Sequence, residues 1–139
     1  MKYYNTYHLQ HTEELNALPN PYPIEMAINN DDIVVNRSDP YNTERFFEFL
    51  SNAREGIPDK VRITRYGIDN PELALKSILE YNGEIFIYTQ SSDFSAPVSY
   101  YGNNINVRYR QPNGPWQYYL LTYDGGEELL FSLYKYHTR

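Results

Sequence analysis

Two histidines near the N-terminus are the first side chains whose spacing could support chemistry. His8 and His11 are three residues apart, so a helix would place both imidazoles on one face. Imidazole is a common zinc ligand, and Glu13 and Glu14 are near, but no spacing in the sequence fixes a third ligand. We favour the alternative that both histidines lie on the surface of an N-terminal segment. The sequence therefore predicts no bound metal.

The carboxylates do not complete a calcium-binding or catalytic pattern. Asp31, Asp32 and Asp39 resemble part of a calcium loop, but its central glycine and terminal glutamate are missing. Glu80 and Glu84 are a possible acid–base pair. They flank an Asn-Gly turn, however, so we expect both to be solvated.

No motif for a nucleophile or a cofactor is present. The chain contains no cysteine, which excludes a thiolate nucleophile, a thiolate metal site and a disulfide. It also has neither a glycine-rich phosphate loop nor the Gly-x-Ser-x-Gly motif of many hydrolases. The sequence therefore predicts no catalytic residue, no cofactor and no enzyme activity. A hydrolase whose site forms only in three dimensions stays open as an alternative.

Arginine and aromatic residues form a more informative pattern, because these types are enriched at binding hot spots. Arg62, Thr64 and Tyr66 alternate along one expected strand and therefore share a face. Arg108 and Arg110 share a face of another expected strand. We predict a ligand-binding surface that consists of Arg62, Tyr66, Tyr100, Tyr101, Arg108, Arg110 and Trp116. The alternative is that the arginines only solvate an uncovered sheet face and balance nearby acids.

The elements that must position these residues include a helix predicted over residues 43–54. Asn42 or Thr43 can cap its start, and Gly56 can end it. Apolar residues at spacings of three and four give it one apolar stripe. The stripe consists of Phe46, Phe47, Leu50 and Ala53, and Phe49 widens it. We expect this helix to lie across a broad sheet and to bury its stripe there.

After this helix the apolar period changes to two, which is typical of strands. Expected strands cover residues 61–66, 77–81, 84–90, 105–110, 116–123 and 129–136. Asn82-Gly83 indicates a hairpin. Residues 71–76 are ambiguous between helix and strand. A loop is expected over residues 91–103, because this segment is rich in Ser, Gly, Asn and Pro. Strands joined by short turns predict an antiparallel meander. The predicted fold class is α+β, with one main helix packed on an antiparallel meander sheet of five or six strands.

The N-terminal part of the chain differs from the rest. A short helix is possible over residues 12–18 with Thr12 as its cap, and the alternating prolines that follow it favour an extended path. Residues 31–36 are expected to be a short strand or an extended lead-in. The length of 139 residues is that of one domain. We predict a single domain over residues 1–139, with residues 1–30 as a candidate peripheral extension.

The charge of the chain limits its partners. Acidic residues outnumber basic ones by 18 to 12, and the net charge is −6. Nucleic acids and anionic lipids are bound mainly through cations, so we predict no nucleic acid and favour a basic or neutral protein partner. We find no membrane-spanning run and no signal-peptide core, which predicts a cytoplasmic location for the sequence as written. If an export signal was removed, the location is extracytoplasmic. The oligomeric state is open.

Four segments of the chain resemble a known family in their order and content. They are residues 32–36, 54–56, 59–66 and 79–83. They are similar to domain of unknown function 4362, found mostly in lipoproteins of Gram-positive bacteria, over roughly residues 31–110. The resemblance implies strand over residues 72–81 and implies no activity, because the family has no assigned one. The lipid-anchor cysteine of such lipoproteins is absent here.

The leading functional prediction is a non-enzymatic binding module for a protein, of the inhibitor or immunity type. It depends on the missing catalytic pattern and on the arginine-rich and aromatic sheet face. A carbohydrate- or cell-wall-binding module is the first alternative, because 16 tyrosines supply rings that could stack on sugars. The hydrolase is the second.

Overall fold

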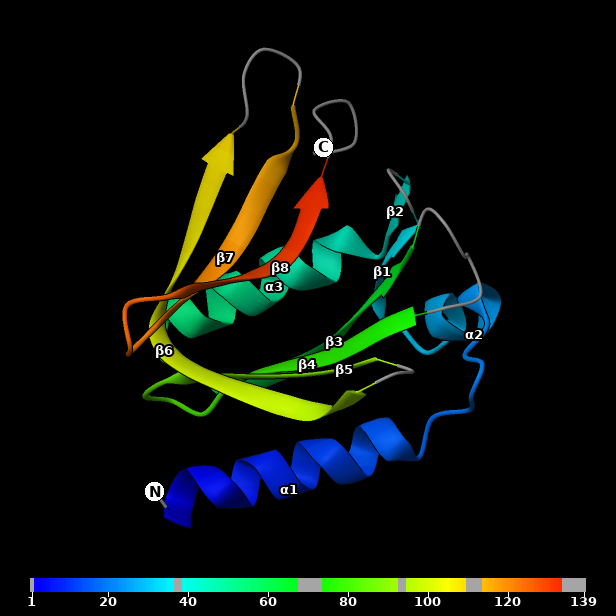
Figure 1. Ribbon diagram of the computed structural model, residues 1–139. Coiled ribbons are helices and arrows are strands. Elements are labelled where there is room, and N and C mark those ends of the chain that lie inside the picture. The colour runs from blue at the N-terminus through cyan, green and yellow to red at the C-terminus, as the bar shows by residue number, and fades with distance from the viewer. Residues whose placement is uncertain (1, 37–38, 68–73, 93–94, 110–113, 134–139) are drawn as a thin grey trace.

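A computed structural model describes residues 2–36, 39–67, 74–92, 95–109 and 114–133, with side chains from residue 5 onward (Figure 1). Within these residues the helices are α1 (Lys2–Asn16), α2 (Ile24–Asn29) and α3 (Thr43–Arg54). The strands are β1 (Ile33–Asn36), β2 (Asp39–Tyr41), β3 (Asp59–Tyr66), β4 (Ala74–Tyr81), β5 (Phe86–Ser92), β6 (Ser95–Tyr109), β7 (Trp116–Thr122) and β8 (Glu127–Leu133).

The eight described strands form a single sheet in the order β2-β1-β3-β4-β5-β6-β7-β8. Strands β3 to β8 are paired antiparallel in chain order. Strand β1 pairs parallel with β3 and antiparallel with β2. The long crossover that a parallel pair requires contains α3.

The prediction of one main helix on an antiparallel sheet of five or six strands is therefore wrong. The described chain has three helices and a mixed sheet of eight strands. Three consecutive residues of β1 are buried, as expected for a strand covered on both faces. Such a short apolar run has no period that could reveal a parallel partner. The segment 91–103, expected to be a loop, supplies the end of β5 and the first half of β6.

Helix α3 begins and ends where the apolar stripe and Gly56 predict, and the sheet curls around it (Figure 1). Phe46 and Phe49 are fully buried in the main core, together with Ile63 and Phe131. The remaining stripe residues are less covered: Leu50 and Ala53 are half-buried and Phe47 is 36% exposed. This core occupies the concave face of the sheet.

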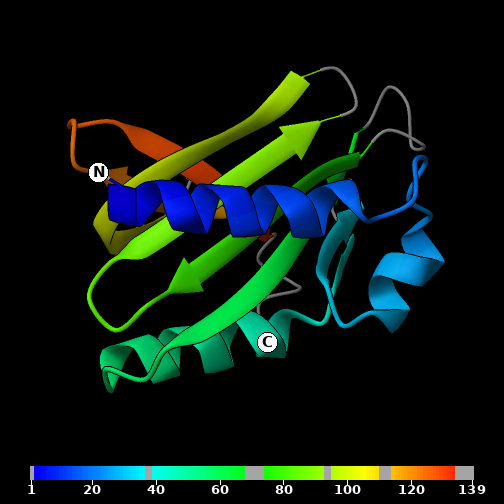
Figure 2. The same ribbon diagram turned by 90° about the horizontal axis from the view of Figure 1, so that it is seen from below.

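Helix α1 lies across the opposite, outer face of the sheet (Figure 2). It contacts β4, β5 and β6, and it buries His11 and Leu15. It is much longer than the helix predicted over residues 12–18, and Thr12 lies in its interior instead of capping its start. The face that the sequence suggested was open is therefore covered in this region.

A second, smaller core joins α2 to the edge of the sheet. Its buried residues are Tyr22, Ala27, Val34, Tyr66 and Ala74. Residues of the predicted N-terminal extension thus pack against β1, β3 and β4. Residues 71–73 of the ambiguous segment lie outside the described residues, and residues 74–76 are strand.

Candidate functional site

Arg62 of β3 lies beneath α1 in a network of charged and polar side chains. Its Nε donates to Asp32 Oδ1 at 2.9 Å and its Nη1 donates to Glu14 Oε2 at 2.8 Å. Asp32 is only 1% exposed, and its Oδ2 accepts from the hydroxyls of Tyr22 at 2.8 Å and Thr64 at 2.9 Å. The network therefore joins α1, the segment before β1, and β3.

The electrostatics of this network indicate a structural role. Burial raises the pKa of the Asp32 carboxyl, although hydrogen bonds from Arg62, Tyr22 and Thr64 act in the opposite direction. Burial alone would also raise the pKa of Glu14, but Lys60 and Arg62 outweigh it and hold that pKa below its ordinary value. Both Asp32 oxygens are used within the protein, so we do not place a ligand there.

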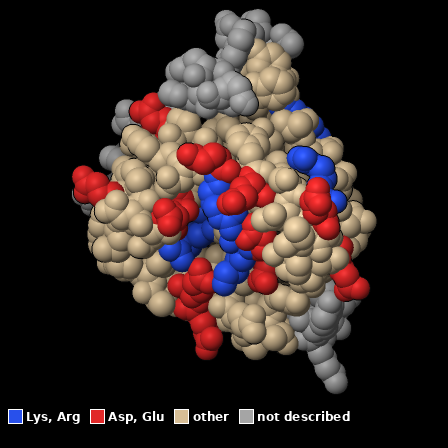
Figure 3. All heavy atoms as spheres, turned by 180° about the vertical axis from the view of Figure 1, so that it is seen from behind, with Lys and Arg blue, Asp and Glu red and all other residues tan. Residues whose placement is uncertain are grey.

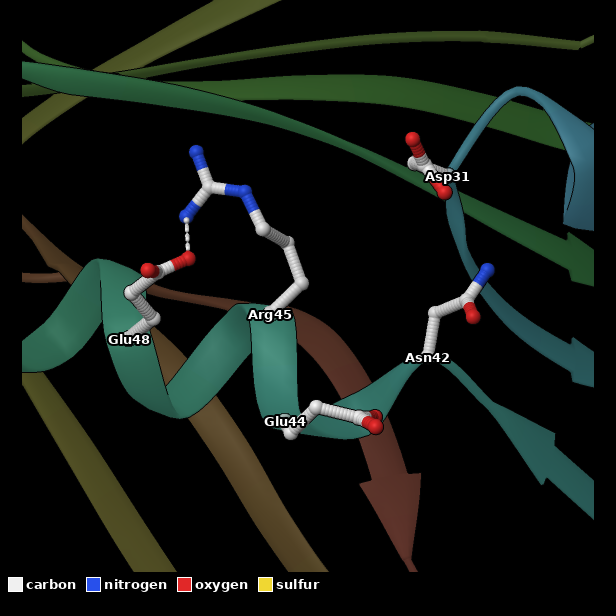
Figure 4. A pocket seen from close by; sticks show the side chains of 5 residues that line it. All are labelled: Asp31, Asn42, Glu44, Arg45 and Glu48. Carbon is white, nitrogen blue, oxygen red and sulfur yellow. Dashed lines mark hydrogen bonds and ion pairs between the residues drawn. The ribbon is translucent and has the colours of Figure 1, made fainter.

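A neighbouring open pocket of about 500 Å³ surrounds Arg45 (Figure 4). It is lined by Asp31, Asn42, Glu44, Arg45 and Glu48. The Arg45 guanidinium donates to both Asp59 oxygens, at 2.6 and 2.9 Å, and to Glu48 at 3.2 Å. In Figure 3 lysine and arginine side chains likewise lie between aspartates and glutamates. The Arg45 guanidinium is therefore already paired with carboxylates of the protein. Among the described residues, no group of three or more histidine or acidic side chains is suited to a metal ion.

Under α1, five side chains form a continuous hydrogen-bonded chain. His11 Nε2 lies 2.7 Å from Glu80 Oε1, and His11 Nδ1 lies 2.8 Å from Thr89 Oγ1. Thr89 Oγ1 is 2.7 Å from Ser99 Oγ. Ser99 Oγ is 2.5 Å from His8 Nδ1. A carboxylate, an imidazole and a hydroxyl in contact are the parts of a hydrolase triad, so the direction of each hydrogen bond matters.

The Glu80 carboxylate can only accept, so His11 Nε2 carries a proton. In a neutral imidazole His11 Nδ1 then accepts from Thr89, Thr89 accepts from Ser99, and Ser99 accepts from His8. In this arrangement, which requires a neutral His11, Ser99 points its proton at Thr89 and not at His8. Thr89 is fully buried and His11 is 1% exposed, so a substrate cannot reach them. We regard this series of hydrogen bonds as the contact that docks α1 on the sheet.

The fourth feature is a recess of about 380 Å³ beside the N-terminal half of α1. Its lining residues are Asn5, Ser99, Tyr100, Tyr101, Thr122, Tyr123 and Asp124, and we call it the tyrosine recess. Strand β6 contributes three of these residues, and the end of β7 with the turn after it contributes another three. Tyr123 is 54% exposed, and its backbone N–H donates to the Tyr101 carbonyl at 3.0 Å.

Asp124 is the charged residue among the described side chains that line the tyrosine recess. Its Oδ1 accepts from the Thr122 hydroxyl and, at 3.1 Å, from the Gly126 N–H. These bonds hold the pKa of the Asp124 carboxyl below its ordinary value, with the Thr122 hydroxyl as the main cause. The recess therefore presents tyrosine side chains beside an ionised carboxylate.

The structure does not bring the described members of the predicted ligand-binding surface together. Arg62 lies in the buried network, and Tyr66 is buried with its hydroxyl donating to the Tyr22 carbonyl at 2.7 Å. Burial raises the pKa of the Tyr66 hydroxyl. Arg108 pairs with Glu127 and lies over the Tyr119 ring, 4.9 Å from its centroid.

The remaining predicted residues divide between two places. The centroid of the Trp116 ring lies 4.8 Å from that of the Tyr109 ring, where β6 ends and β7 begins. Tyr100 and Tyr101 line the tyrosine recess, in β6 instead of the expected loop. Arg110 lies outside the described residues.

Sequence reasoning missed Asn5, Ser99, Thr122, Tyr123 and Asp124 as recess residues. One signal was present: Asp124-Gly125-Gly126, a sequence typical of a turn, follows Tyr123 directly. The pairing of β6 with β7, which brings Tyr101 beside Tyr123, depends on a register that local patterns do not reveal.

Comparison with known proteins finds no matching family model, no matching curated protein and no matching solved structure. The resemblance to the lipoprotein-associated domain therefore remains a prediction. None of the helices in the described ranges has the length and apolar character needed to cross a membrane.

Proposed function

We propose that this chain is a non-enzymatic module that binds a protein partner, and that the tyrosine recess is its binding site. The observation that carries the proposal is the recess itself, a hollow of about 380 Å³ with tyrosines and one carboxylate in its lining. Tyrosine is enriched at binding hot spots because its ring is large, rigid and amphipathic. The volume lies at the small end of the range for ligand sites, about 300–1,000 Å³.

The charged features of the molecule support the same choice. Arg45, Lys60, Arg62 and Arg108 all pair with carboxylates of the protein itself. With a neutral His11, the Ser99 hydroxyl donates to Thr89 and lacks the activation that a serine nucleophile needs. A site for a partner is therefore better supported at the recess than at the arginines, and better supported than catalysis.

Capture of the native partner tests this proposal. Wild-type protein, a Tyr123→Ala variant and a Tyr41→Ala control would be immobilised and exposed to extract of the native cell. Tyr41 is a matched control because it is an exposed tyrosine, at 39%, in β2. We expect Tyr123→Ala to lose a protein that the wild type and the control both retain, while circular dichroism shows that the variant is folded. Equal retention by all three would place the binding site elsewhere.

A further inference from the structure

We infer that the partner presents a basic segment, and that a lysine or arginine side chain of this segment occupies the tyrosine recess. This inference rests on the proposed function and adds the chemistry of the ligand. The first argument is the lining, which is mainly apolar and aromatic. An alkyl stem gains from burial against such a surface, and its cationic end is attracted to the face of a tyrosine ring.

The second argument is the charge at the recess. Asp124 lines it, and the hydrogen bonds from Thr122 and Gly126 favour its ionised form. Both of these bonds reach Oδ1, and neither of them engages Oδ2. A second carboxylate is electrostatically coupled to it: the pKa of Glu128 is raised by burial and then by the Asp124 charge. Among the residues whose side chains the structure describes, no lysine or arginine lines this recess.

The third argument is the charge of the whole molecule. Four cations that could attract an acidic ligand are already paired, namely Arg45, Lys60, Arg62 and Arg108. The net charge of −6 instead attracts a basic segment and raises its rate of encounter. A neutral sugar could stack on the tyrosines but would gain nothing from Asp124, which is why we choose the cation.

The test uses defined probes and the intact chain. Hexalysine, a length-matched hexaglutamine peptide and the neutral sugar chitotetraose would each be titrated into isotope-labelled protein, with amide chemical shifts as the readout. We expect hexalysine to shift the amides of Tyr101, Tyr123 and Asp124, and expect hexaglutamine and chitotetraose to leave them unchanged. The affinity for hexalysine should fall as salt rises, because its charges are screened.

Two substitutions separate the recess from the general negative charge. Asp124→Asn removes the charge but keeps an oxygen that can accept from Thr122 and Gly126. Glu55→Gln removes one charge from an exposed residue after α3 and is the matched control. We expect Asp124→Asn to weaken hexalysine binding about fivefold, near the upper end for a surface ion pair, and Glu55→Gln to have much less effect. Tyr123→Ala should weaken it two- to fivefold, roughly the strength of an exposed cation–π contact, whereas Tyr41→Ala should not.

Equal effects of Asp124→Asn and Glu55→Gln would overturn the inference, because hexalysine would then bind the acidic surface without using the recess. Shifts of the recess amides by hexaglutamine or chitotetraose alone would also overturn it, in favour of a neutral peptide or a sugar. If Tyr123→Ala loses the native partner but hexalysine does not reach the recess, the proposed function stands and this inference fails. If Tyr123→Ala keeps the native partner, the proposed function itself fails.

Discussion

At the scale of single residues, Arg62 and Arg108 show how burial changes the role of one residue type. The Arg62 side chain is 16% exposed and pairs with a carboxylate that is 1% exposed, that of Asp32. The Arg108 side chain is 47% exposed and pairs with Glu127 at the surface. Removing one partner of a buried pair leaves the other charge without compensation, whereas a surface pair contributes little to stability.

We therefore expect Arg62→Ala to lower the free energy of unfolding by about 3–5 kcal/mol. Asp32 would keep the hydrogen bonds from the Tyr22 and Thr64 hydroxyls but would lose the paired guanidinium of Arg62. Chemical denaturation of both variants measures the effect, with Arg108→Ala as the matched control for which we expect a much smaller change. Similar losses in the two variants would show that Asp32 is neutralised in another way.

At the scale of elements, β6 is the strand that shapes the sheet. Its first half pairs with β5 and its second half with β7, and the register shifts between Gly102 and Asn104. A Cβ at Gly102 would lie 1.9 Å from the Leu121 carbonyl oxygen. The backbone of β7 approaches too closely for any side chain, so glycine is required at this bulge.

Gly102→Ala should accordingly destabilise the protein by at least about 2–3 kcal/mol, because backbone atoms must move apart. Gly125→Ala is the control: Gly125 has φ +91° and open space around its Cβ position. Its substitution should cost only the strain of a positive φ, about 1–2 kcal/mol. Thermal unfolding of the two variants compares these effects, and a smaller loss for Gly102→Ala would contradict the close approach.

Helix α1 is a second element whose role depends on its contacts. Much of its docking is polar, through His8 on Ser99, His11 on Thr89 and Glu80, and Glu14 on Lys60 and Arg62. Leu15 adds a buried apolar side chain. Because its N-terminal half also borders the tyrosine recess through Asn5, the docking of α1 determines one wall of the proposed binding site.

At the scale of the whole molecule, β3 connects the layers on both faces of the sheet. Asp59 of β3 pairs with Arg45 of α3, and Lys60 and Arg62 of β3 pair with Glu14 of α1. Hydrogen bonds from Arg45 hold the pKa of Asp59 below its ordinary value of 3.8, against the effect of burial. Glu14 likewise has a pKa below its ordinary value of 4.5.

These lowered values give the sign of a pH dependence. A carboxylate whose pKa is lower in the folded state stabilises the fold fully above its unfolded-state pKa, and that stabilisation is lost as pH falls through the folded-state pKa. Asp32 and Glu128, whose pKa values are raised, act with the opposite sign. The contribution of Asp59 is therefore best isolated by substitution.

We expect Asp59→Asn to have a lower melting temperature than the wild type at pH 7. The difference should shrink as the pH falls below 3.8, because Asp59 of the wild type is then neutralised as well. Melting curves of both proteins between neutral and strongly acidic pH measure this convergence. A difference that stays constant across the range would show that the ion pair with Arg45 contributes no stability.

The sequence by itself determined the elements whose signals are local. The period of the apolar residues and a terminal glycine place α3, and alternation places β3. Asn82 and Gly83 mark the hairpin: the Asn82 side chain accepts from the backbone N–H groups of Glu84 and Ile85. These features follow from spacing and turn chemistry within a few residues, so they needed no knowledge of distant partners.

The tertiary structure alone decided the features that depend on distant partners. The parallel pairing of β1 with β3, the position of α1 on the outer face and the strand character of residues 95–103 have no local period to reveal them. The environment of each site residue depends on these long-range contacts. Alternation correctly places Arg62 on the outer face, but only the docking of α1 buries it, and only the β6–β7 register brings Tyr101 beside Tyr123. A strand pattern specifies which residues share a face, whereas burial and pairing depend on what packs against that face.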